Sequence, residues 1–129
     1  IAAALKDAMK PIVERLKEAF PETSILIVSV GDREYKDENG ELCTMPGVKR
    51  LIRYQQALAA ETHVAFWNMF EAMGGEGSMV KMVESKPQMA NYDYTHINFR
   101  GGKHIAGLLF ETLMYGKEQY EKRKAYEME

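Results

Sequence analysis

The amino-acid sequence predicts an α/β protein with parallel strands. Two short apolar runs, residues 24–30 and 63–67, are rich in β-branched and aromatic residues, which is the pattern of strands in a parallel sheet. Segments with apolar residues three and four positions apart precede and follow these runs and predict helices. Because helices and strands alternate along the chain, helical crossovers connect the strands, and a parallel sheet is expected.

The first helix is predicted over residues 1–20. Pro11 interrupts it and predicts either a kink or a helix that restarts with Pro11 in its first turn. The first strand, residues 24–30, is expected to be buried on both faces. The apolar stripe of the first helix consists of Leu5, Met9, Ile12, Leu16 and Phe20.

Residues 31–46 turn polar and predict a long surface loop with a tight turn at Asn39 and Gly40. A second helix follows over residues 47–62, and a second buried strand over residues 63–67. Residues 69–73 predict a single helical turn stopped by glycine. Ser78 is expected to cap a short helix that reaches Ser85 before Pro87.

The last long helix is predicted to begin after Asn98, a favourable N-cap residue. Residues 117–129 are charged and predict an exposed helical extension or tail. Two strands are too few for a stable sheet, and the sequence opens with Ile1, so it is expected to be the second half of a single α/β domain. The buried stripe of the last helix is predicted to comprise Ile105, Leu108, Leu109, Thr112 and Leu113.

The amino-acid composition of the chain argues against several classes of function. A length of 129 residues with 46% hydrophobic residues suits one globular domain. A net charge of -2 and a pI near 6.0 give no basic surface for nucleic acid, and no apolar run is long enough to span a membrane. Cys43 is the single cysteine, which excludes an internal disulfide and a cysteine zinc site.

Asp93 and His96 form the most informative pattern in the chain. An Asp three residues before a His can accept the ring Nδ1–H, which leaves Nε2 free to take a proton from a nucleophile. This pair is two thirds of a hydrolytic triad, and the missing third is a serine. The alternative interpretation is that Asp93 caps a turn and His96 lies near a helix start.

Other polar residues are weaker candidates. Ser29 lies near the carboxyl end of a strand, where open α/β sheets place their chemistry, but alternation within a buried strand favours a side chain that points into the packing. Asp32 and Glu34, near the end of the same strand, are candidates for lining a substrate pocket, with a solvated loop as the alternative. Arg100 is a further candidate, which could touch an anionic substrate or simply lie on the surface.

The remaining histidines give little reason to expect a metal or a cofactor. His63 and His104 lack nearby carboxylates at a ligand spacing, so neither suggests a metal site. The chain also has no glycine-rich phosphate loop between a strand and a helix, which disfavours a nucleotide-binding module. No metal and no cofactor are therefore expected.

The segment from Asp93 to His96, followed by Asn98 and Gly101, resembles the last conserved block of the SGNH or GDSL hydrolases. Residues 67–75 and 24–32 are similar to the strand-and-loop segments that precede this block in a bacterial subgroup of these esterases and acylhydrolases. The resemblance covers nearly all of the chain to about Gly116. It implies part of a flavodoxin-like α/β/α sandwich, with the N-terminal strands missing.

By this resemblance, His96 is the general base and Asp93 its orienting acid. The family's Gly-Asp-Ser nucleophile motif and its oxyanion-hole residues have no counterpart here, since Gly31 and Asp32 are followed by Arg33. The resemblance implies a serine ester hydrolase, with carbohydrate or peptidoglycan O-acetyl groups as a substrate class and a periplasmic or secreted location.

The missing serine leaves two possibilities for the chain itself. Either it contributes the His and Asp of a triad to an active esterase, or it is a catalytically incomplete fragment. In the second case it acts only with a complementary N-terminal half or with another copy of the chain.

Overall fold

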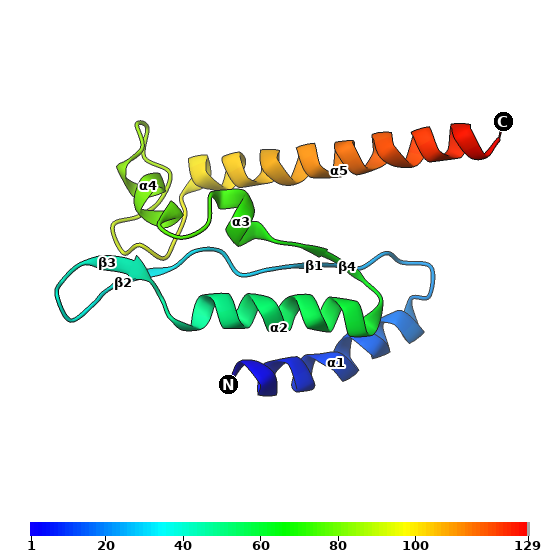
Figure 1. Ribbon diagram of the computed structural model, residues 1–129, viewed down its shortest axis with the longest axis horizontal. Helices are drawn as coiled ribbons and strands as arrows, with labels where there is room; N and C mark the ends of the chain where they lie inside the picture. Colours follow the sequence, from blue (N-terminus) through cyan, green and yellow to red (C-terminus); the bar gives the residue numbers. More distant parts are fainter. Residues whose placement is uncertain (129) are drawn as a thin grey trace.

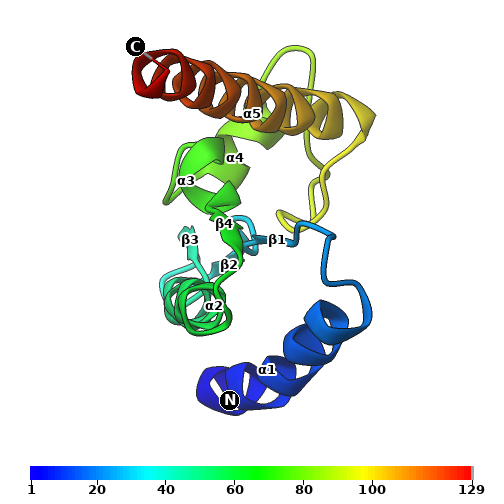
Figure 2. The same cartoon turned by 90° about the vertical axis from the view of Figure 1, so that its right-hand side faces the viewer.

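A computed structural model describes residues 1–128 (Figure 1). It contains a parallel pair of strands, β1 (Leu26–Val28) and β4 (Ala65–Trp67), connected through helix α2 (Gly47–Thr62). Helices α1 (Ala2–Ala19) and α2 lie on one side of this pair. Helices α3 (Met69–Met73), α4 (Ser78–Glu84) and α5 (Phe99–Glu127) lie on the other side, as Figure 2 also shows. The predicted α/β class with parallel strands is confirmed.

The segment between β1 and α2 is more ordered than predicted. It forms an antiparallel hairpin of β2 (Glu34–Lys36) and β3 (Leu42–Thr44), two short strands that the prediction of a long surface loop did not include. The Asp37 carboxylate stabilises the turn by accepting hydrogen bonds from the N–H groups of Asn39, at 2.8 Å, and Glu41, at 2.9 Å. Asn39 and Gly40 do lie at this turn, as predicted.

The helices follow the sequence pattern closely. Helices α2 and α3 have the predicted bounds, and the Asn98 side chain caps α5 by accepting the Gly101 N–H at 3.0 Å. Helix α1 runs unbroken through Pro11, so it does not restart there. Ser78 is the first residue of α4 and makes no capping hydrogen bond; the N-cap is Gly77.

The core of the described residues consists of two small clusters. One is centred on Trp67, α4 and Ile105, and the other joins Phe70 to α2. The buried stripe of α5 ends near Leu109, because Thr112 and Leu113 are exposed, and the helix from residue 117 to its end projects into solvent as predicted. Glu129 lies outside the described residues.

Strand β1 is less buried than its composition predicted. Leu26 and Val28 are each 40% exposed, so burial on both faces is wrong. The apolar stripe of α1 also remains about half exposed along its length. These surfaces lie exposed because, within residues 1–128, β1 is paired with β4 alone and each core cluster is small.

Each helix within residues 1–128 is either too short or too polar to span a lipid bilayer.

Candidate active site

The turn at residues 93–96, called the Asp–His turn below, brings the two predicted side chains together. Oδ1 of Asp93 accepts hydrogen bonds from the backbone N–H groups of Thr95 and His96, each at 3.0 Å. Oδ2 of Asp93 lies 2.6 Å from Nδ1 of His96. One carboxylate therefore both shapes the turn and orients the ring. With the proton on Nδ1, the ring presents Nε2 as the acceptor.

The electrostatics of the pair favour an ionised Asp93. The hydrogen bond from His96, with those from the two backbone N–H groups, lowers the pKa of Asp93 from 3.8 to about 2. The side chains are 48% exposed at Asp93 and 72% at His96, so water screens the attraction. The contact therefore orients the imidazole more than it stabilises the fold.

The Asp–His turn is held from two neighbouring segments. Tyr94 has a left-handed backbone with φ of 55°, a conformation that a bulky residue adopts at a cost. The Glu34 N–H at the start of β2 donates to the Tyr94 carbonyl at 3.0 Å, and the Asn91 N–H donates to the His96 carbonyl at 2.8 Å. These bonds support the strained turn and connect it to the hairpin.

His96 borders an open cavity of about 340 Å³ at the carboxyl end of β1. This is the edge at which open α/β sheets bind ligands. Residues 95–97 form one wall and residues 30–33 another. The remaining lining side chains are apolar: Met69, Met73, Met79 and Ile105.

Asp32 borders this cavity but is only 2% exposed, so the solvated-loop alternative is wrong. Its Oδ1 accepts from the Thr44 hydroxyl at 2.7 Å, and its Oδ2 accepts from the Met79 N–H at 3.0 Å. The Asp32 carboxylate thus joins the hairpin to α4. Arg100 is exposed in the first turn of α5 and is not part of the cavity wall. The substrate-binding roles of both residues stay predictions.

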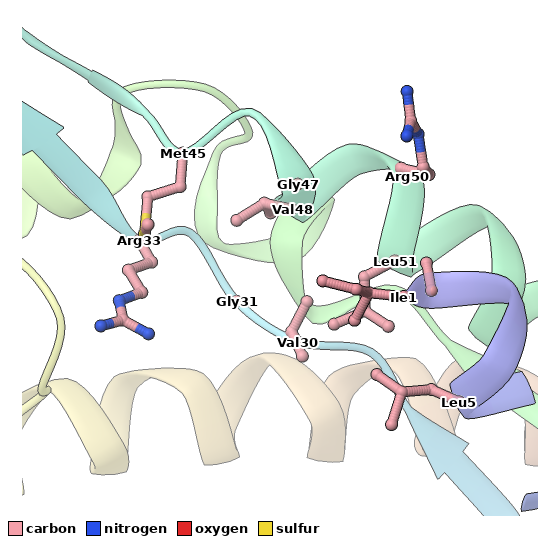
Figure 3. Close-up of a pocket in the computed structure, with 11 residues that line it drawn as sticks. Ile1, Leu5, Val30, Gly31, Arg33, Met45, Gly47, Val48, Arg50 and Leu51 are labelled. Carbon is pink, nitrogen blue, oxygen red and sulfur yellow. The ribbon is translucent and has the colours of Figure 1, made fainter. Parts of the chain in front are cut away.

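Arg33 is a site residue that the sequence reasoning missed. It borders the His96 cavity and also a second cavity, of about 470 Å³, which is drawn in Figure 3 and shares Val30 and Gly31 with the first. In Figure 3 its guanidinium points away from the apolar side chains of Leu5 and Leu51. The sequence feature that could have identified Arg33 is its position directly after the candidate Asp32, in the segment that follows β1.

Ser29 is built into the packing and does not face His96. It is 2% exposed, and its Oγ accepts the Met69 N–H at 2.9 Å and donates to the Val30 carbonyl at 3.0 Å. Ser78 is buried as well, and neither serine borders the His96 cavity. The Ser29 hydroxyl therefore caps the start of α3 from a neighbouring segment.

We expect Ser29→Ala to destabilise the chain by about 1–2 kcal/mol, because the Met69 N–H would lose its acceptor in a buried place. Urea unfolding followed by circular dichroism measures this change. The control is Ser24→Ala, since Ser24 is exposed and should tolerate alanine. Equal stability of the two variants would contradict the capping role.

The other two histidines lie elsewhere. His63 is the left-handed C-cap residue of α2, with φ of 56°, and His104 is exposed on α5. His63 therefore does not open β4. Within residues 1–128, no group of three or more His, Cys, Asp or Glu side chains could hold a metal ion.

The fold and the site together describe an α/β protein with an acid and histidine pair at the carboxyl end of a parallel strand. No family model and no curated protein matches the sequence. A solved structure described as "Peptidoglycan O-acetylesterase in action, 5 min" is similar to this chain with a TM-score of 0.77 at 20% identity. The match covers 89% of this chain and 32% of that one, so this chain spans about a third of its length. This similarity establishes the fold.

Proposed function

We propose that this chain supplies the histidine and the acid of a serine ester hydrolase active site of the SGNH type. The observation that carries the proposal is the 2.6 Å contact between Oδ2 of Asp93 and Nδ1 of His96 beside the cavity at the end of β1. The fold similarity to an esterase structure supports the same reaction class.

In the proposed reaction, Nε2 of His96 takes the proton of a serine hydroxyl as the serine attacks the ester carbonyl. Asp93 holds the ring in the required tautomer and stabilises the imidazolium that forms. His96 then returns the proton to the leaving alcohol, and an acyl-enzyme remains. A water molecule, deprotonated by His96, releases the acid and restores the serine.

The nucleophile is proposed to come from a complementary N-terminal half of the domain or from another copy of the chain. Ser29 and Ser78 are buried and do not border the cavity. The half-exposed apolar residues of β1 and α1 favour such completion, because a further strand and helix would cover them. Without that complement, the chain is a catalytically incomplete fragment.

The substrate is proposed to be an acetyl ester of a carbohydrate, with peptidoglycan O-acetyl groups as the first choice. This substrate class comes from the similar structure, which is that of a peptidoglycan O-acetylesterase. A periplasmic or secreted location follows from the same proposal.

Hydrolysis of p-nitrophenyl acetate tests the proposal, with the 129-residue chain alone and with a version extended at the N-terminus by a segment carrying Gly-Asp-Ser. We expect activity only in the extended protein and its loss in His96→Ala. The control is His104→Ala, an exposed histidine outside the cavity. An extended protein whose activity survives His96→Ala would overturn the proposal. Activity of the 129-residue chain that depends on His96 would overturn the fragment alternative.

A further inference from the structure

Glu34, the first residue of β2, has a buried carboxyl group that no part of the proposed reaction uses. It is 5% exposed, and among residues 1–128 neither of its carboxylate oxygens has a hydrogen-bond partner. Its side chain lies against the start of α4, where a Cβ added at Gly77 would be 3.9 Å from Oε1. A buried carboxylate without donors is costly, so its protonation state needs an explanation.

The explanation is the neighbouring carboxylate of Asp32. A second negative charge in a buried place beside another carboxylate is unfavourable, so Glu34 holds its proton more tightly than an exposed glutamate does. Both oxygens of Asp32 already accept hydrogen bonds, from Thr44 and Met79, which places the proton on Glu34. A protonated Glu34 can donate to Asp32, and this bond gives it the partner that the ionised form lacks. Burial, followed by the hydrogen bond and charge of Asp32, raises the pKa of Glu34 to about 7.

The backbone of the same residue supports the Asp–His turn. The Glu34 N–H donates to the carbonyl of Tyr94 at 3.0 Å, and Tyr94 is the left-handed residue between Asp93 and His96. Glu34 is also paired with Thr44 across the hairpin. Glu34 therefore connects three elements: its side chain contacts α4, and its backbone contacts β3 and the turn.

We propose that Glu34 is a positioning residue whose protonated side chain keeps β2 against α4 and thereby keeps its N–H on the Asp–His turn. Ionisation of Glu34 places two negative charges in contact in a buried place. The Glu34 side chain then moves toward water, its N–H leaves Tyr94, and the turn relaxes. The consequence for catalysis rests on the proposed ester hydrolysis, whereas the coupling of Glu34 to the turn does not.

The direction of the pH effect follows from the charged groups around Glu34. The charge that raises the pKa of Glu34 is that of Asp32. The elements around Glu34 also carry other titratable groups, which are Glu76 and Lys81 near α4, Cys43 in β3, and Asp93 and His96 in the turn.

In the unfolded chain Glu34 has its ordinary pKa of 4.5, and in the folded chain its pKa is about 7. The folded state therefore holds an extra proton between these values, and stability falls as pH rises from 4.5 to 7. Above pH 7 this contribution is constant.

Amide hydrogen exchange of the 129-residue chain, measured by NMR between pH 5 and 9, tests the proposal. In the unmodified chain we expect the protection factors of the Glu34 and His96 amides to fall about tenfold across a transition near pH 7. Glu34→Gln keeps the shape and a donor for Asp32 but cannot ionise, so these factors should stay constant. The control is Glu41→Gln, an exposed acid of the same hairpin, which should keep the transition.

A second measurement needs no variant. The side-chain carboxyl carbon of Glu34 should titrate near pH 7, together with the amides of the turn. Titration near 4.5, or the same pH dependence of protection in Glu34→Gln and in the unmodified chain, would overturn the proposal. Because neither measurement uses a substrate, a failure here leaves the esterase test unaffected, and an inactive protein leaves this result standing.

Discussion

Gly101→Ala is expected to destabilise the chain by about 3 kcal/mol or more, because an added methyl group has no room. A Cβ at this position falls on the backbone carbonyl oxygen of Met89, and it lies 3.0 Å from Cε of Met82 and 3.2 Å from Cβ of Ile97. Met82 could move its flexible end, but a backbone carbonyl cannot. The Met89 carbonyl also accepts the Asn98 N–H at 3.0 Å, so moving it disturbs the start of α5.

The neighbouring glycine provides the matched control. A Cβ at Gly102 is 4.0 Å from Cδ1 of Ile97, which is an ordinary contact. Since Gly102 lies inside α5, Gly102→Ala should stabilise the chain by up to about 1 kcal/mol through helix propensity. Urea unfolding of both variants measures the difference. Similar midpoints for the two variants would show that α5 does not pack against residue 89 as the structure describes.

Local signals account for the parts of the fold that the sequence predicted well. Helix α2 ends where its apolar period stops, α3 ends at a left-handed Gly74, and Asn98 caps α5 with its own side chain. Each of these features is determined by residues within a few positions of one another. Helix periodicity and capping chemistry are therefore sufficient to locate them.

The missed parts depend on contacts between residues further apart in the sequence. The hairpin has too few apolar residues to show strand alternation, and the hydrogen bond from the Thr44 hydroxyl to Asp32 joins its second strand to the segment before its first. Burial of β1 was overpredicted because composition reports the apolar character of Leu26 and Val28 but not what covers them. Sequence patterns alone do not give the number of neighbouring strands.

The residues of the candidate site also differ in whether local sequence or distant contacts determine their positions. Asp93 and His96 could be paired from their spacing, since three residues suffice for the carboxylate to reach both the ring and the backbone. Glu34 could be named as a candidate pocket residue, but its relation to the Asp–His turn and that of Arg33 could not be predicted, because both depend on the start of β2 lying beside the turn. The sequence therefore predicted the chemistry of the site but not the residues that surround it.

Asp93→Asn is expected to lower kcat for ester hydrolysis by about 10⁴-fold in the extended protein that carries a serine, with a smaller effect on KM. An asparagine can keep its Oδ1 on the Thr95 and His96 N–H groups, so the turn survives. Its Nδ2 then donates to Nδ1 of His96. The ring must carry its proton on Nε2, and it can no longer accept one from a nucleophile.

Asp37→Asn is the matched control, since Asp37 makes the same kind of backbone turn bonds in the hairpin without a histidine. It should leave kcat unchanged. Nitrogen NMR of the imidazole of His96 in the 129-residue chain reports the tautomer directly, without a nucleophile or substrate. We expect the proton on Nδ1 in the unmodified chain and on Nε2 in Asp93→Asn. The same tautomer in both proteins would mean that the 2.6 Å contact does not control the ring, and Asp93 would then be only a residue that shapes the turn.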